Sequence, residues 1–199
     1  MNWSEIDLSQ LMRYFWVLAY AAVIGIAYLV GKLAVRKRLA RLREIAPYLG
    51  AQAVSGFLGP RLEGVKGGRN FVVAVVPGGK NSPPVIRLTI DSFLPVPFSV
   101  QRPDMMTGLM GVFIKQAPTG DQDFDDKFFA SSPDPLSFAA FFADSRRRAA
   151  ARRLLERGYA RVESKKGKAS ANMPAVELEA ELEPAKISAA LDDLAELSA

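Results

Sequence analysis

The chain has 199 residues, a formal net charge of +5, no cysteine and no histidine. The missing cysteines exclude disulfides, thiol nucleophiles and cysteine-ligated metals, and the missing histidines remove the commonest metal ligand and general base. Most hydrolytic triads and zinc sites are therefore excluded, although carboxylate, lysine, serine or tyrosine chemistry is not. We expect a protein that needs no cofactor, and we favour a binding role over an enzymatic one.

An uncharged apolar run fills residues 14–31 and begins with aromatic residues at 14–16. At about 1.5 Å per residue the run is roughly 27 Å long, which matches the hydrocarbon thickness of a bilayer. A cleaved signal peptide would carry its basic residues before a shorter apolar core, whereas here they follow it. We therefore expect a short N-terminal tail at residues 1–10 and an uncleaved transmembrane helix at residues 11–35.

Basic residues are concentrated on one side of this span. Arg13 is the single basic residue before it, whereas six follow closely. The positive-inside rule then places the N-terminus outside and the rest of the chain on the cytoplasmic side of the inner membrane. We expect a basic helical linker at residues 36–60 and a cytoplasmic α+β domain at residues 61–199. The linker residues expected to contact a partner or the membrane are Arg36, Lys37, Arg38, Arg41 and Arg43.

The first half of the domain shows strand patterns after a helical start. The helix of the span should continue to residue 46 and end at Pro47. The run FVVAVV at residues 71–76 and the alternating residues 85–90 predict an antiparallel hairpin. The remaining predictions are a short helical segment at 48–58, a loop at 61–70, and strands at 97–102 and 110–116.

The second half combines helices with one further hairpin. Asp134 followed by Pro135 predicts a helix start, and a second helix should occupy residues 144–157 and end at Gly158. We expect a hairpin of residues 159–163 and 176–182 around a loop at 164–174, then a helix from Pro184 with an apolar stripe of Ile187, Leu191, Leu194 and Leu197. These elements predict an α+β fold: one N-terminal transmembrane helix, then a mostly antiparallel sheet with helices packed on one side.

Asp121, Asp123 and Asp125 have the D-x-D-x-D spacing that begins a calcium-binding loop. Such a loop also needs glycine at its sixth position and a bidentate glutamate at its twelfth, where this chain has Asp126 and Ser132. We favour a structural turn in which Asp121 or Asp123 accepts hydrogen bonds from backbone N–H groups. The alternative is a metal-binding sensor or an enzyme that uses the loop at residues 121–126.

The same segment carries the pattern Thr-Gly-Asp-x-x-Phe-Asp-x-x-Phe at residues 119–128, with Phe124 and Phe128 expected in the core. This pattern resembles a feature of uncharacterised bacterial single-pass membrane-anchored proteins. The resemblance implies a span, a basic juxtamembrane helix, a meandering sheet and a short C-terminal helix over most of residues 10–199. No active residue can be carried over, because the function of those families is unknown, and the arginine-rich helix at 145–157 departs from the pattern.

This arginine-rich helix has three possible roles. It can be a solvated surface, it can attract an acidic protein or anionic lipid, or it can bind nucleic acid. We disfavour nucleic acid because no aromatic platform is interleaved with the basic residues. We expect a membrane-anchored interaction or accessory protein that docks on an acidic partner or an anionic membrane surface, or alternatively a subunit of a larger membrane complex. The candidate residues in this helix are Arg146, Arg147, Arg148, Arg152 and Arg153.

Overall fold

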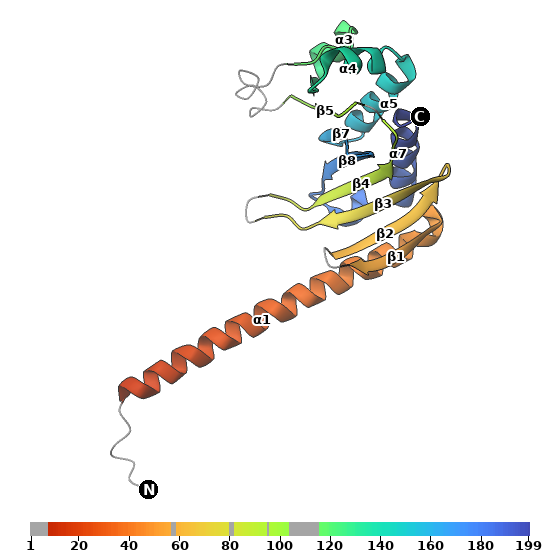
Figure 1. The fold of residues 1–199 in the computed structure, drawn as a ribbon. Helices are drawn as coiled ribbons and strands as arrows, with labels where there is room; N and C mark the ends of the chain where they lie inside the picture. The colour runs from red at the N-terminus through yellow and green to blue at the C-terminus, as the bar shows by residue number, and fades with distance from the viewer. Residues whose placement is uncertain (1–7, 57–58, 80–81, 95, 104–115) are drawn as a thin grey trace.

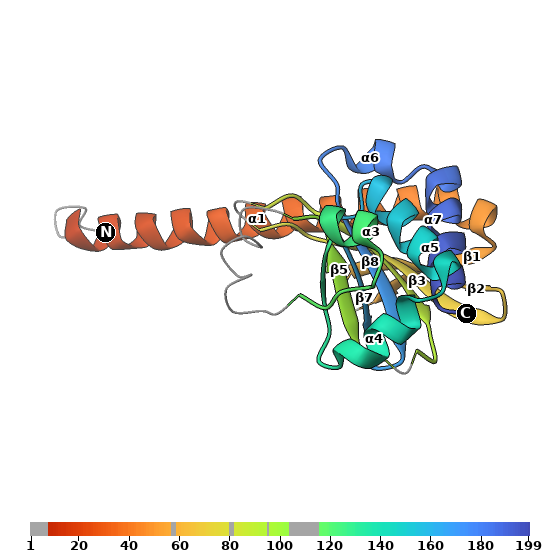
Figure 2. The same cartoon turned by 90° about the horizontal axis from the view of Figure 1, so that it is seen from above.

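A computed structural model describes residues 8–56, 59–79, 82–94, 96–103 and 116–199. A long helix, α1 (Leu8–Ile45), projects from a body made of one antiparallel sheet and several helices (Figures 1 and 2). The predicted α+β class, with an apolar N-terminal helix before a mostly antiparallel sheet, is confirmed.

Helix α1 is continuous from the apolar run into the basic linker. Side chains of the run are exposed on all described sides, and the mean hydropathy of its most apolar window is 1.9. Leu42 and Ile45, near the C-terminal end of the helix, are instead buried against the body. Such a helix is consistent with a single membrane anchor or with a signal sequence. Its last turns belong to the core, so the helix and the body are packed together.

The sheet has eight strands in the order β1-β2-β3-β4-β8-β7-β5-β6, and every neighbouring pair is antiparallel. The predicted hairpin is confirmed as β3 and β4, and the strand expected at 97–102 is confirmed as β5. The expected strand at 110–116 lies, except for Gln116, outside the described residues. The bounds are β1 (Ala51–Gly56), β2 (Gly59–Lys66), β3 (Arg69–Val76), β4 (Val85–Asp91), β5 (Phe98–Gln101), β6 (Phe129–Ser131), β7 (Arg161–Lys165) and β8 (Lys168–Pro174).

Two predictions before β3 are wrong. The expected helix at 48–58 is a short 3-10 helix, η2 (Ala46–Leu49), followed by strand β1. The expected loop at 61–70 is strand β2 and the start of β3, because Gly64 serves a packing role instead of breaking the strand. Gly64 pairs with Phe71, and a Cβ at Gly64 would lie only 2.6 Å from the Phe71 ring. The missing side chain therefore makes room for a buried aromatic ring of the neighbouring strand.

The hairpin expected between residues 159–163 and 176–182 is also wrong in its second strand. Strand β7 pairs with β8 across a tight turn in which Lys166 and Gly167 both have positive φ, as a type I′ turn requires. Residues 178–181 form a short helix, α6 (Leu178–Glu181). The alternating sequence at 176–182 does not form a strand, because alternation leads to a strand only where a neighbouring strand is free to pair with it. β8 already fills the position between β4 and β7.

The remaining helices match their sequence signals. Asp134 and Asp144 cap α4 (Pro135–Phe142) and α5 (Ser145–Glu156) by accepting backbone hydrogen bonds. The predicted apolar stripe of α7 (Pro184–Leu197) is fully buried. Together with the end of α1, these helices cover one face of the sheet. On that face a cross-strand row is buried from β2 to β6: Leu62, Val73, Leu88, Ala171, Val162, Val100 and Ala130.

Candidate membrane-proximal groove

A groove of about 660 Å³ lies between the basic end of α1 and the segment around α6. Its α1 wall contains Ala34, Lys37, Arg38 and Arg41, whose spacing of three and four residues places them on one side of a helix. The opposite wall contributes the acidic side chains Glu177 and Glu179, with Leu178, Ala180 and Leu182 between and beyond them. The groove is therefore basic on one wall and acidic on the other, with apolar surface between.

Hydrogen bonding within the α1 wall is incomplete. Arg41 donates from Nη1 to Glu44 at 2.7 Å, but its Nε is buried and has no hydrogen-bond partner among the residues that the structure describes. Among the ion pairs of the described residues, none crosses the groove. The charged side chains of the two walls therefore do not neutralise each other directly.

The position of the groove along α1 relates it to the apolar run. Ala34 and Arg41 follow the end of that run at Gly31 by about 4 and 15 Å along a helix axis. If the run spans a bilayer, this distance corresponds to the polar headgroup layer and the water next to it. Arg36 and Arg43 are exposed but are not among the residues that line the groove. Of the five predicted linker residues, the structure thus brings three together.

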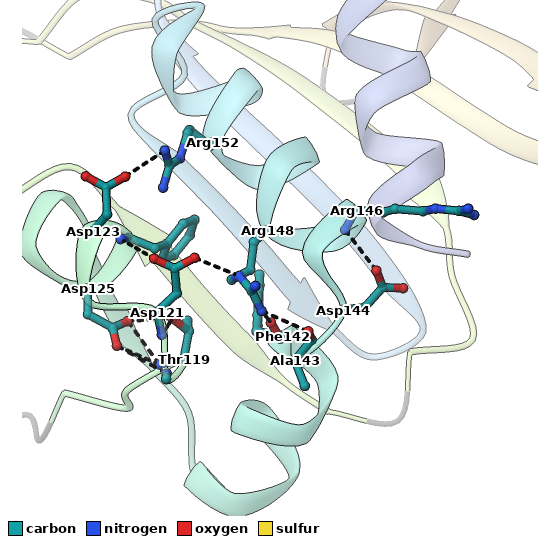
Figure 3. Close-up of polar contacts among 12 residues, drawn as sticks. Thr119, Asp121, Asp123, Asp125, Phe142, Ala143, Asp144, Arg146, Arg148 and Arg152 are labelled. Atoms are coloured by element: carbon teal, nitrogen blue, oxygen red, sulfur yellow. Dashed lines mark hydrogen bonds and ion pairs between the residues drawn. The ribbon is translucent and has the colours of Figure 1, made fainter.

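The predicted arginines of α5 are turned largely toward the protein itself. Arg148 contacts Asp121 at 3.1 Å through Nε, and it donates to the carbonyls of Phe142 and Ala143 (Figure 3). Arg152 contacts Asp123 at 2.8 Å, so α5 is joined by two ion pairs to the loop that precedes α3 and to α3 (Gln122–Lys127). The structure therefore brings two predicted basic residues onto two predicted acidic ones.

The other face of α5 is joined to α7. Arg153 and Arg157 donate to opposite oxygens of Asp193, at 2.6 and 3.1 Å, and Asp193 is buried. The hydrogen bond to Asp193 raises the pKa of Arg153 above its ordinary value. Arg147 lies over the Phe141 ring, 4.3 Å from its centroid, whereas the Arg146 side chain points away from the loop in Figure 3. Most arginine side chains of this helix consequently make contacts within the protein.

The aspartate-rich loop is also held by its own chain. Asp125 accepts from the backbone N–H groups of Thr119 and Gly120 and from the Thr119 hydroxyl at 2.8 Å. Asp121 caps α3 by accepting from the Phe124 N–H at 3.1 Å, and Gly120 has a φ of +86°, which favours glycine. Phe124 and Phe128 are buried as predicted. The motif is thus a loop latch, which we define as Thr119, Gly120, Asp121 and Asp125.

Asp123 is the exposed member of the predicted metal candidates. Hydrogen bonds from Lys127 and then Arg152 lower the pKa of its carboxyl below the ordinary value. No group of three or more histidine, cysteine, aspartate or glutamate side chains is arranged for a metal ion in the part of the chain that is described. The carboxylates Asp121, Asp123 and Asp125 each have partners from the chain.

The acidic wall of the groove has no counterpart among the sequence-based predictions. In the strand predicted at 176–182, Glu177 and Glu179 alternate with apolar residues and lie on its polar side. Pro174 is the sequence signal against that strand, because it ends β8 and leaves the following residues beyond the sheet. Their position opposite α1 follows from the path of the chain from β8 to α7 and has no local sequence signal.

Comparison with known proteins adds one structural relative. No family model and no curated protein sequence matches the chain. The chain is similar to the crystal structure of the mycobacterial trehalose monomycolate transport factor A, TtfA, with a TM-score of 0.53 and 11% sequence identity. The similarity covers 80% of this chain and 92% of that chain. At this level of identity the similarity establishes a shared fold alone.

Proposed function

We propose that this chain is a membrane-anchored accessory protein that holds a juxtamembrane segment of a neighbouring membrane protein in the groove between α1 and α6. The observation that carries the proposal is the groove itself, with a basic wall, an acidic wall and apolar surface between them. An occupant with both charges and an apolar stripe would complement these walls. TtfA is a transport factor, and the shared fold supports a role for this chain in an assembly that moves material at a membrane.

The proposed organisation keeps the N-terminus outside and the body in the cytoplasm at the inner membrane. It comprises a tail at residues 1–10, a span at 11–35, a basic linker at 36–60 and the main domain at 61–199. Strand β1, which lies in the linker, is already part of the sheet. The basic linker supports this orientation because positively charged segments remain on the cytoplasmic side. A reporter fused after Ala199 should be active only in the cytoplasm.

Site-specific photo-crosslinking in cells tests the groove. A photoreactive residue at Ala180, in the groove, should crosslink to an integral membrane protein, whereas one at the exposed Ala140 of α4 should not. Replacing Lys37 and Arg38 by Gln should reduce the Ala180 crosslink by about tenfold, which corresponds to roughly 1.4 kcal/mol.

Arg36→Gln with Arg43→Gln is the matched control, because it removes the same charge from the same helix outside the groove. This control should retain the crosslink. Equal loss in both double variants would reject a groove-specific contact, and so would crosslinking only to soluble proteins. An extracytoplasmic signal from the reporter at Ala199 would reject the orientation.

A further inference from the structure

A second hollow, of about 580 Å³, lies beside the ends of β4, β8, β7 and β5, with Gly158, which directly follows α5, in its lining. Three arginines line it: Arg87 on β4, Arg161 on β7 and Arg102 just after β5. No carboxylate is among its described lining residues. The strand register explains the gathering, because one cross-strand row passes from Arg87 through Asn172 and Arg161 to Gln101. Arg87 and Arg161 are thus two strands apart, at roughly 10 Å.

The hydrogen bonds in this row leave donors facing the hollow. Arg87 donates from Nε to Asn172 Oδ1 at 2.8 Å, and Arg161 donates from Nε and Nη2 to Gln101 Oε1 at 2.9 and 2.7 Å. The side-chain oxygens of both amides are therefore used by arginines, which leaves their NH₂ groups as donors. Arg102 donates to the Leu155 carbonyl. The charges of these three arginines are not paired with any carboxylate of the described residues.

A surface of arginine and amide donors is complementary to a ligand that offers several negatively charged oxygens. Phosphate is such a ligand, because guanidinium groups bind its oxygens in pairs. Val85, Ala160 and Pro174 add apolar surface beside the arginines, which a free inorganic ion would not use. The combination fits a phosphate attached to an apolar or glycerol-like group.

The hollow also lies at the end of the sheet that faces the anchor. Val85, Pro174, Arg161 and Gln101 are at the same end of their antiparallel strands. Figure 1 shows that β3 ends and β4 begins on the side of the body toward which the N-terminal part of α1 extends. We propose that the hollow binds the phosphate headgroup of an anionic membrane lipid. This inference rests on the membrane anchoring proposed above but not on the groove.

The test uses the full chain in neutral detergent and counts bound lipids by native mass spectrometry. The probe is dioctanoyl phosphatidylglycerol, compared with glycerol 3-phosphate and inorganic phosphate. We expect the short lipid to bind and the two free phosphates to bind at least about tenfold more weakly. Arg87→Gln with Arg161→Gln should weaken lipid binding by about tenfold or more, because charge-assisted hydrogen bonds are lost.

The matched control is Lys165→Gln with Lys168→Gln, which removes two charges from an adjacent pair at the other end of β7 and β8. It should retain binding. Equal weakening in both double variants, tighter binding of the free phosphates, or no lipid binding would overturn the proposal. If the arginine variant does not fold, Asn172→Asp replaces a donor by a carboxylate of the same shape and should abolish binding. Retained binding in Asn172→Asp would equally reject the site. Failure of the anchor would be visible separately, as full-length chain that does not pellet with membranes.

Discussion

At the scale of single residues, the loop latch shows how an aspartate-rich motif holds its own loop through side-chain bonds to the backbone. Both oxygens of Asp125 accept from the backbone N–H of Thr119, and Oδ2 also lies near the N–H of Gly120. A carboxylate is acceptor-only, so it satisfies several converging donors at once. The Asp125 carboxylate therefore fixes the loop before α3 through bonds to its own backbone.

Asp125→Asn therefore tests the latch with almost no change of shape. One side-chain oxygen becomes an NH₂ group that faces backbone donors, so we expect the free energy of unfolding to fall by about 1–3 kcal/mol. Urea unfolding of the full chain in neutral detergent measures this. Asp126→Asn, at an exposed neighbour without a described side-chain bond, is the control and should change stability little. An unchanged midpoint for Asp125→Asn would contradict the assigned role.

The cap of α4 predicts a pH dependence. Hydrogen bonds from the hydroxyl and then the backbone of Ser137 lower the pKa of Asp134 below its ordinary value of 3.8. A folded-state pKa below the unfolded one means that the stabilisation is present above about pH 4 and is lost as the pH falls through the folded-state pKa. Asp134→Ala should thus lower the melting temperature at pH 7, and the difference from wild type should narrow below pH 3.8. A constant difference would show that the charged carboxylate is not responsible.

At the scale of elements, α5 is the connecting helix of the body. One side of it is bound by ion pairs to the loop latch and α3, and the other side is bound to α7 through Asp193. Asp193 is buried, whereas Arg153 and Arg157 are about 40% exposed in their side chains, at 39% and 43%. If Asp193 is removed, the two arginines can be hydrated. If the arginines are removed, the Asp193 carboxylate remains buried.

This difference predicts an asymmetry between variants. Asp193→Ala should cost about 1–3 kcal/mol, because both arginines can turn toward solvent. Arg153→Ala combined with Arg157→Ala should cost about 3–5 kcal/mol, because it leaves a buried carboxylate without its cations. Urea unfolding of the two variants and of the triple variant provides the comparison. The reverse order would mean that Asp193 gains solvent when the arginines are removed.

At the scale of the whole molecule, α1 fixes the position of the body relative to its apolar half. The helix runs unbroken from Leu8 to Ile45, and Leu42 and Ile45 are packed in the core. Both the groove and the arginine-lined hollow depend on this geometry, since each must lie near the headgroup layer to receive what we propose. A flexible linker would let the groove and the hollow vary in their distance from the membrane.

Glycine pairs in the exposed part of the helix test this coupling. Val35→Gly with Arg36→Gly should together cost about 1 kcal/mol of helix stability without touching the core. The chain has no cysteine, so spin labels can be introduced at Tyr28 and at the exposed Phe93. We expect a narrow distance distribution in the otherwise unaltered chain and a broad one in the glycine variant. Equal widths would show that the helix does not set the position of the body.

The sequence by itself determined what depends on neighbours along the chain. Continuous apolar runs predicted the apolar helix and β3, hydrophobic periodicity predicted β4 and the buried stripe of α7, and aspartate caps predicted the starts of α4 and α5. Each of these signals arises from local hydrogen bonding or from burial of one face, so a short stretch contains the whole pattern.

Only the tertiary structure decided which charges are used internally and which remain available. The acidic partners of Arg148, Arg152 and Arg153 lie about 30 to 40 residues away along the chain, so no local pattern in α5 predicts these ion pairs. Arg87 and Arg161 come together only because β4 and β7 both flank β8. An ion pair or a shared hollow depends on distance in space, and that distance is set by strand order, which no local pattern contains.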